Sequence, residues 1–189
     1  MHDATQVLRQ EHEVILRVLD ATQNIASQIE NAAGAPPQVM SNTIEFFKLY
    51  ADRQHHGKEE DLLFPELEKK GMPRDGGPIG VMLMEHQFGR SHITRMAEAA
   101  RAFEGGDHSA GARWADAALD YVALLRQHID KENNILFVMA ERILSPDDQQ
   151  RLAKEFAGVD QQKMGEGEND RLLRLADSVV QAASASSRP

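Results

Sequence analysis

Residues 54–64 read QHHGKEEDLLF and residues 127–137 read QHIDKENNILF, so the two stretches match without a gap. A Glu-His pair precedes each stretch at nearly the same distance. The intervals are 43 and 42 residues for the pairs His12–His55 and His86–His128. A unit that occurs twice in this way predicts two helical hairpins of the same plan, packed about a pseudo-twofold axis with equivalent residues facing each other.

Apolar residues recur at helical spacing along most of the chain, and glycine and proline gather between these segments. The pattern predicts four long helices, over residues 5–33, over 37–70, between the loop 71–80 and Gly105, and over 109–144. Pro65 lies inside the second helix and is expected to kink or loosen it, because proline has no N–H donor.

A fifth helix is predicted over residues 146–158, where a Ser, a Pro and two acids form a typical helix start. Beyond it a weaker helical pattern leads into a Ser- and Ala-rich tail that is expected to fray. The predicted fold is therefore all-α: an antiparallel up-down four-helix bundle over residues 1–145, followed by an accessory segment, 146–189, with an additional C-terminal helix and a frayed tail.

The composition excludes several classes of function. The chain has 189 residues, 30 acidic and 21 basic side chains and a net charge of −9, which disfavours nucleic acid as a partner. The absence of Cys excludes disulfides, thiolate nucleophiles and zinc ribbons. No run approaches the ~20 apolar residues of a membrane span, and the first residues do not resemble a secretion signal. A cytoplasmic protein without a membrane partner is expected, and its oligomeric state stays open.

The repeated motif places polar residues on the apolar stripes of all four bundle helices. They are His12, His55, Glu59, His86, His128 and Glu132. His and Glu four residues apart share one helical face, so both can point into the bundle. Burying them among Leu and Ile is costly unless a cation pairs them, and two metal ions about 3.5–4 Å apart satisfy this set. We therefore predict a two-metal centre bridged by the two Glu, with iron as the expected metal and manganese or zinc as alternatives.

Simpler interpretations apply to each feature taken alone. An isolated His on an apolar stripe is more often a core residue than a ligand, and a single His–Glu pair at this spacing is usually a surface salt bridge. His56 and Glu60 form a second such pair, turned by ~100° from the first, and the repeat has Ile129 in place of His56. His56 is thus a solvated neighbour, a seventh ligand or a proton carrier behind the ligands. Glu11 and Glu85 are either partners behind the ligands or exposed helix acids.

At these residues the sequence resembles the haemerythrin-like, or HHE cation-binding, domains. The likeness covers about residues 5–145 and is most specific over residues 55–65, HHGKEEDLLFP. The resemblance implies a four-helix bundle around a non-haem di-iron centre with an oxo or hydroxo bridge. Members of this family bind oxygen reversibly, sense oxygen or iron, handle nitric oxide or peroxide, or help to repair damaged iron centres.

The resemblance is closest to a divergent branch of that family. Oxygen-carrying haemerythrins have two His four residues apart on the third helix and His and Asp five apart on the fourth. Here Arg90 follows His86 at that spacing, and His128 pairs with Glu132. One imidazole fewer implies an open metal position, which favours turnover or sensing over oxygen storage. Arg90 is then either a positive charge beside that position or a side chain that reaches solvent.

These features predict a di-iron protein that binds or reacts with a small ligand such as O₂, peroxide or NO, and whether it turns over stays open. The alternatives are an iron or oxygen sensor without turnover and the repair of damaged iron centres. The iron-sensing F-box protein and the repair proteins are similar at the ligand positions, but the Cys-bearing segment of the repair proteins is not found here. A bundle held by buried salt bridges alone is the least favoured interpretation, and a ferritin-like oxidase needs a Glu-x-x-His motif that the sequence lacks.

Overall fold

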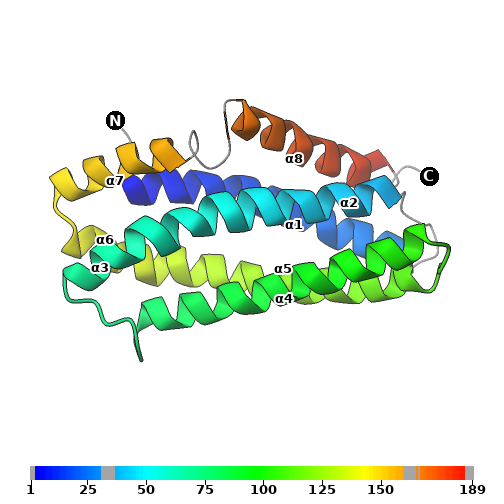
Figure 1. Ribbon diagram of the computed structural model, residues 1–189, viewed down its shortest axis with the longest axis horizontal. Helices are drawn as coiled ribbons and strands as arrows, with labels where there is room; N and C mark the ends of the chain where they lie inside the picture. The colour runs from blue at the N-terminus through cyan, green and yellow to red at the C-terminus, as the bar shows by residue number, and fades with distance from the viewer. Residues whose placement is uncertain (1–2, 31–36, 160–164, 166, 186–189) are drawn as a thin grey trace.

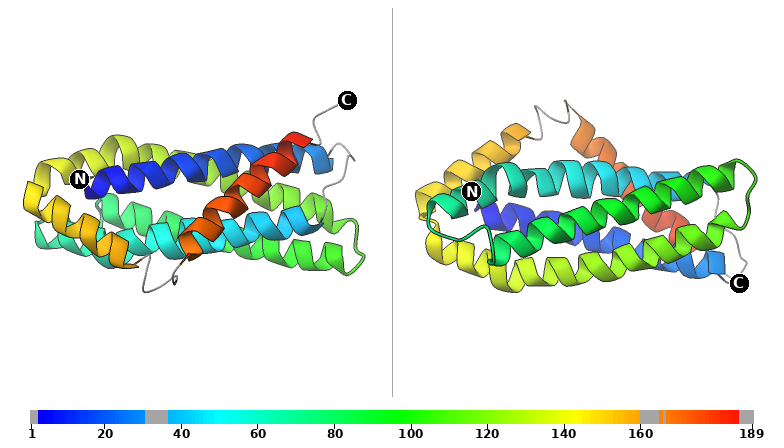
Figure 2. Two further views of the ribbon diagram at one scale, coloured as in Figure 1. Left: turned by 90° about the horizontal axis from the view of Figure 1, so that it is seen from above. Right: turned by 60° about the horizontal axis from the view of Figure 1, so that its bottom comes forward.

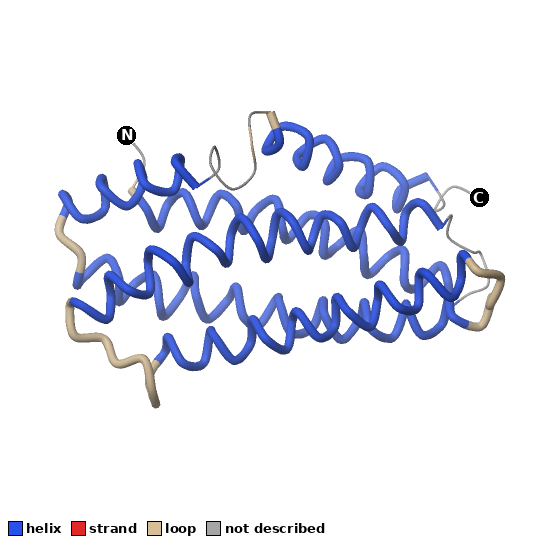
Figure 3. Tube along the Cα trace, viewed as in Figure 1, coloured by secondary structure: helices blue, strands red, loops and turns tan. Residues whose placement is uncertain are grey.

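The computed structural model describes residues 3–30, 37–159, 165 and 167–185, and every regular element in this part is a helix. Four helical rods lie together and successive rods run in opposite directions (Figure 1; Figure 3). In chain order they consist of α1 (Ala4–Glu30); α2 (Pro37–Phe46), η1 (Phe47–His56), η2 (Glu59–Leu63) and α3 (Phe64–Lys69); α4 (Pro78–Glu104); and α5 (Ala110–Lys131), η3 (Glu132–Leu136) and α6 (Phe137–Ile143). This confirms the predicted antiparallel four-helix bundle; the end of the first predicted helix, residues 31–33, lies outside the described residues.

The three η segments are π-helical, with wider turns whose hydrogen bonds join residues i and i+5. They coincide with the repeated motif, because η1 ends at His56 while η2 and η3 begin at Glu59 and Glu132. Pro65 lies near the start of α3, directly after η2. An equivalent π-turn, η3, occurs in the second repeat, where Val138 stands in place of this proline, so the wide turn is a feature of the repeated motif and does not depend on Pro65.

The two halves of the bundle repeat each other in structure as well as in sequence. In the register that aligns His12 with His86, α1 and α4 begin at equivalent residues. In the register that aligns His55 with His128, α2 and α5 also begin at equivalent residues. The pseudo-twofold relation therefore extends over whole helices, and it allows each position to be compared with its counterpart in the other half.

Two apolar clusters form the core, one toward each end of the bundle. The larger cluster contains Phe47, Trp114 and Tyr121, and the smaller one contains Phe64 and Phe137. Along each rod, the polar residues of the repeated motif fall between residues of the two clusters. The fold thus encloses a polar layer between two apolar layers.

Two helices follow the bundle, one more than the sequence analysis predicts: α7 (Pro146–Val159) and α8 (Glu168–Ala185). α7 adds Leu152 and Phe156 to the smaller cluster, and α8 adds Leu172 and Ala176 to the larger one. Figure 2 shows α8 crossing over the bundle on the side of α1 and α2. The final residues of the tail that is expected to fray, 186–189, lie outside the described residues. None of the described helices is long and apolar enough to cross a membrane.

Candidate metal centre

The six residues predicted to bind metal lie together in the polar layer between the two clusters. They come from all four rods: His12 from α1, His55 and Glu59 from η1 and η2, His86 from α4, and His128 and Glu132 from α5 and η3. Each has at most 1% of its surface exposed. Polar side chains buried this deeply require partners, because an uncompensated buried charge is costly.

Acceptors behind the four histidines fix their tautomers. Each Nδ1 atom lies 2.7–3.0 Å from a side-chain oxygen, in the pairs His12–Asn133, His55–Glu11, His86–Glu60 and His128–Glu85. Because the Nδ1 proton is donated to that oxygen, a neutral ring has a bare Nε2. The Nε2 atoms point at each other, 2.9 Å apart in one pair and 3.1 Å apart in the other, His12–His55 and His86–His128. Lone pairs at this distance repel unless a cation or a proton lies between them.

The carboxylates of Glu59 and Glu132 lie across these two histidine pairs. Glu59 has one oxygen 3.8 Å from Nε2 of His55 and the other 3.5 Å from Nε2 of His86. Glu132 has its two oxygens 3.2 Å from the Nε2 atoms of the remaining two histidines. Within the described residues, none of these four oxygens has a hydrogen-bond partner of acceptable geometry. Each carboxylate therefore offers one oxygen to each pair, which is the arrangement of a ligand that bridges two metal ions.

The close packing of these buried carboxylates and imidazoles shifts their pKa values. Burial and the Glu132 carboxylate raise the pKa of Glu59 well above its usual value. Burial opposes ionisation of Glu132 as well, but His128 and His12 hold its pKa well below the usual value. Burial lowers the pKa of His128, yet Glu132 and Glu85 outweigh it and raise the pKa to about 9. Without a cation, His128 therefore retains a proton near neutral pH, and burial favours the protonated form of Glu59.

Two groups of donor atoms result, and each is compact enough to hold one cation. One group is His12, His55, Glu59 and Glu132; the other is His56, Glu59, His86 and His128. Within each group the donor atoms lie within 4.8 Å of one another, and all the side chains are buried. Mixed imidazole and carboxylate donors suit iron, manganese or zinc. The residues present therefore fit a pair of such ions.

His56 belongs to the second group, so its interpretation as a solvated neighbour is wrong. Its side chain is 3% exposed, and its ring stacks on His86 with centroids 3.8 Å apart. The wide turns of η1 rotate successive side chains by less than the ~100° of an α-helix, so His55 and His56 both face the bundle interior. Burial and the neighbouring His86 lower the pKa of His56 to about 3, which keeps the imidazole neutral and able to bind a cation.

Glu11 and Glu85 lie behind the histidines at equivalent places of the two halves. Glu11 accepts hydrogen bonds from Nδ1 of His55, at 2.9 Å, and from the buried Lys58. Glu85 makes the corresponding contacts with His128 and with the lysine of the second repeat. Of the two alternatives for these acids, the structure thus shows partners of the site histidines. Such carboxylates orient the ring and make its other nitrogen a better ligand.

Arg90 lies behind the histidines as well, on the side away from their Nε2 atoms. Its guanidinium donates to Asp52 and to Glu60, each at 2.8 Å. Asp52 lies 3.5 Å from Nδ1 of His56, and Glu60 accepts from Nδ1 of His86. Arg90 therefore supports two histidine partners and does not face the space between the donor groups. The second donor group nevertheless contains three imidazoles, because His56 joins His86 and His128.

Removal of one of these supporting carboxylates is expected to weaken metal binding, although all the residues predicted to bind metal are still present. Glu11→Ala leaves His55 free to rotate and to change tautomer, which raises the metal dissociation constant about 10–100-fold. Glu13→Ala changes an exposed acid on the same helix and is the matched control, with unchanged affinity. Competition titrations with a chelator measure both variants, and equal affinities would contradict the role of Glu11.

Metal binding is also expected to release protons. His128 retains a proton at pH 7.5 in the metal-free site, and burial favours a second proton on Glu59. Loading both positions at pH 7.5 is therefore expected to release between about one and two protons per chain. His128 loses its own proton as the pH rises through about 9, so the release falls by about one proton above that pH and the apparent affinity rises less steeply with pH. A pH-stat titration with ferrous iron under anaerobic conditions measures this release. A release near zero at pH 7.5 contradicts the assigned protonation.

Comparison with known proteins places this geometry in a family. The family model described as "Hemerythrin HHE cation binding domain" matches residues 3–140, which contain both donor groups. Similar curated proteins include "Uncharacterized protein Mb2018" of Mycobacterium bovis and "Uncharacterized protein Rv1995" of Mycobacterium tuberculosis. Each is 23% identical over 163 residues, covering 86% of this chain and 63% of the relative, so the chain spans less than two thirds of their length. No solved structure matches the chain. The chain belongs to the hemerythrin HHE cation-binding domain family.

Proposed function

We propose that this protein is a cytoplasmic non-haem di-iron protein that binds or reacts with a small ligand such as O₂, peroxide or NO. The observation that carries the proposal is the pair of donor groups that share Glu59, with Glu132 lying 3.2 Å from one histidine of each group. The four oxygens of these two carboxylates lack hydrogen-bond partners among the described residues. Two iron ions with an oxo or hydroxo bridge would give these oxygens and the facing Nε2 atoms a positively charged partner.

The two positions would differ in their protein ligands. His56, His86 and His128 would hold one iron, whereas the other would have only His12 and His55 besides the shared carboxylates. When bound, the iron pair supplies electrons and an exchangeable coordination position for the small ligand. The position with two imidazoles has one histidine donor fewer than the other, and we assign the small ligand to it.

Aromatic side chains from the two repeats limit access of water to the site. Phe137 stacks on His12 with centroids 5.5 Å apart, and the equivalent Phe64 stacks on His86 at 6.0 Å. Both phenylalanines are at most 1% exposed. A site walled in this way excludes bulk water, so protons reach it through the carboxylates behind the histidines. This environment suits a small neutral ligand that can diffuse through the packed core.

Spectroscopy of the iron-loaded protein tests the proposal. Iron analysis is expected to give about two ions per chain, and the near-ultraviolet spectrum is expected to show absorption from the bridge. Addition of O₂, hydrogen peroxide or NO to the reduced protein is expected to change that spectrum. A fully loaded protein whose spectrum responds to none of the three ligands would contradict the proposed function while leaving the metal centre itself intact.

One observation favours a second candidate, a sensor or regulatory module without turnover. The carboxylate of Glu59 is buried without a hydrogen-bond partner among the described residues, so a bound cation would stabilise the fold and couple metal loading to folding. A sensor is expected to lose structure when iron is chelated and to decompose peroxide no faster than free iron. Sustained decomposition well above that background supports turnover instead. Urea unfolding and a peroxide assay on the same preparation separate the two candidates.

A further inference from the structure

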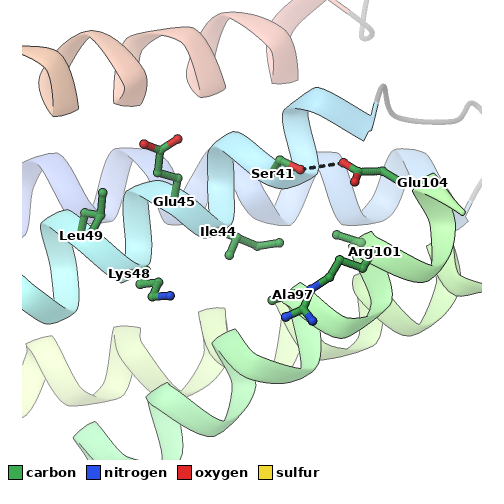
Figure 4. A pocket seen from close by; sticks show the side chains of 9 residues that line it. Ser41, Ile44, Glu45, Lys48, Leu49, Ala97, Arg101 and Glu104 are labelled. Carbon is green, nitrogen blue, oxygen red and sulfur yellow. Dashed lines mark hydrogen bonds between the residues drawn. The ribbon is translucent and has the colours of Figure 1, made fainter.

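A groove runs along the outside of the bundle between α2–η1 and α4. Three adjoining hollows of about 380, 230 and 370 Å³ share lining residues and form it. Ile44 and Ala97 line the two hollows nearest α2, and Ile93 lines the middle one. Figure 4 shows Ile44 and Ala97 between Lys48 on one wall and Arg101 on the other. The groove therefore has an apolar floor and basic side chains on both walls.

The groove has a small excess of basic side chains, although the protein as a whole is acidic. The three hollows are lined by four basic residues and three acids, and one of these acids, Glu45, already pairs with Arg171 outside the groove. The middle hollow has three basic side chains, Lys48, Arg90 and Arg101, against a single acid, Asp52, which already pairs with Arg90. Within the described part of the chain, Lys48 and Arg101 make no salt bridge. The chain as a whole has a net charge of −9. Two uncompensated cations that face each other across an apolar floor are complementary to an anionic group with an apolar body.

The residues that line this groove on α2–η1 differ from their counterparts in the other half of the repeat. The register that aligns His55 with His128 pairs Ser41 and Lys48 of the groove with Trp114 and Tyr121. Both aromatic residues are fully buried in the larger apolar cluster. A small and a charged residue on α2–η1 thus stand where the other half of the repeat has large core residues. The groove is a specific departure from the repeated plan.

Residues between the groove and the metal centre also differ between the two halves of the repeat. Asp52 and His56 correspond to Leu125 and Ile129 in the other half, both of them buried apolar residues. Arg90, which bonds to Asp52, corresponds to Leu16. Asp52 and Arg90 also line two of the three hollows. A polar path therefore leads from the groove to the partners of His56, whereas the opposite side is closed by apolar residues.

We propose that this groove binds a small organic carboxylate with an apolar chain. Its carboxylate lies between Lys48 and Arg101, and its chain lies on Ile44, Ile93 and Ala97. The proposal goes beyond the proposed function, since it requires no reaction at the metal centre. The occupant lies next to the Arg90–Asp52 ion pair, so the site is placed where binding can be sensed by His56.

A second basic hollow on the bundle is the natural comparison. It lies between α4 and α5 and is lined by Arg95 and Arg113 with Glu98 and Asp116. Its two arginines already pair with Asp120 and Asp107, at 3.0 and 2.8 Å. This hollow has basic side chains without the uncompensated charge, so it is not expected to bind an organic anion.

Calorimetric titration of the iron-loaded protein with octanoate tests the proposal. Octanoate is expected to bind with a dissociation constant below about 1 mM, and octanol at least about fivefold more weakly, because it lacks the charge. Lys48→Gln with Arg101→Gln is expected to weaken octanoate binding at least about fivefold. Arg95→Gln with Arg113→Gln removes the same charge from the comparison hollow and is expected to leave the affinity unchanged.

A charge-reversal variant provides a second, independent test of the proposal. Lys48→Glu with Arg101→Glu is expected to abolish octanoate binding and to create binding of octylammonium. The proposal is overturned if octanoate does not bind the unmodified protein, if octanol binds equally well, or if the two double Gln variants lose affinity equally. These titrations do not depend on any response to O₂, peroxide or NO, so their failure is distinct from failure of the proposed function.

Discussion

Replacing Glu59 with Ala is expected to empty both metal positions. Glu59 belongs to both donor groups, and its loss removes one carboxylate donor from each ion. Bound iron is expected to fall from about two ions per chain to below about 0.2. His12→Ala, by contrast, removes a donor from one group only and is expected to leave about one ion. The measurement is elemental analysis after gel filtration in metal-free buffer.

His92→Ala is the control for these variants, because His92 is also on a bundle helix but belongs to neither donor group. It is expected to retain both ions. If Glu59→Ala and His12→Ala lose equal amounts of iron, the two groups are not separate positions joined by a common carboxylate. If Glu59→Ala retains both ions, the bridging role of Glu59 is wrong.

The second prediction concerns the free energy of unfolding of a Glu59 variant. The expected change has opposite signs with and without metal. Glu59→Leu removes a carboxylate that is fully buried and has no hydrogen-bond partner among the described residues. Without metal, this variant is expected to be more stable than the unmodified protein by about 1–3 kcal/mol, since the cost of burying an unpartnered group disappears. With iron present the order reverses, because only the unmodified protein gains the free energy of metal binding.

Urea unfolding with iron and with a chelator measures both effects in one experiment. The Glu59→Leu curve is expected to be the same in both conditions and to lie between the two curves of the unmodified protein. Ile44→Leu, a change of shape at the groove floor, is a control that preserves the metal dependence. A Glu59→Leu variant that is less stable than the metal-free protein would show that the carboxylate already has a stabilising partner.

The sequence predicts those parts of the site that depend on regular helical spacing. His and Glu four residues apart on an apolar stripe identify Glu59 and Glu132 together with His55 and His128. The repeated Glu-His pairs upstream identify the other two histidines. The same reasoning assumes ~100° per residue, and η1 departs from that value. For this reason His56 could not be assigned from spacing, although the HHxxxE sequence shows two adjacent candidates.

Residues behind the ligands were harder to predict, because they depend on contacts between helices. Glu60 and Asp52 look like ordinary exposed helix acids in the sequence. In the structure they accept from Arg90 and face the Nδ1 atoms of two histidines. One signal was available in the sequence. Arg90 and Asp52 align with Leu16 and Leu125 in the other half, and a charged residue where the repeat has leucine indicates a specific role.

The C-terminal helices show the same distinction between local and long-range information. The start of α7 has a Ser, a Pro and acids at the expected places, and its boundary at Pro146 follows from them. α8 lacks so clear a start and is rich in Ala and Ser, so its sequence alone resembles a fading helix. Burial of Leu172, Ala176 and Val179 against the bundle stabilises it, and this contribution is visible only in the folded chain.

The most direct test of the two-metal centre is a crystal structure of the iron-loaded protein with anomalous data collected at the iron edge. The account predicts two anomalous peaks about 3.5–4 Å apart, one among His12, His55, Glu59 and Glu132 and the other among His56, His86, His128 and Glu59. A single peak, or iron bound only to acids on the surface of the bundle, would contradict it.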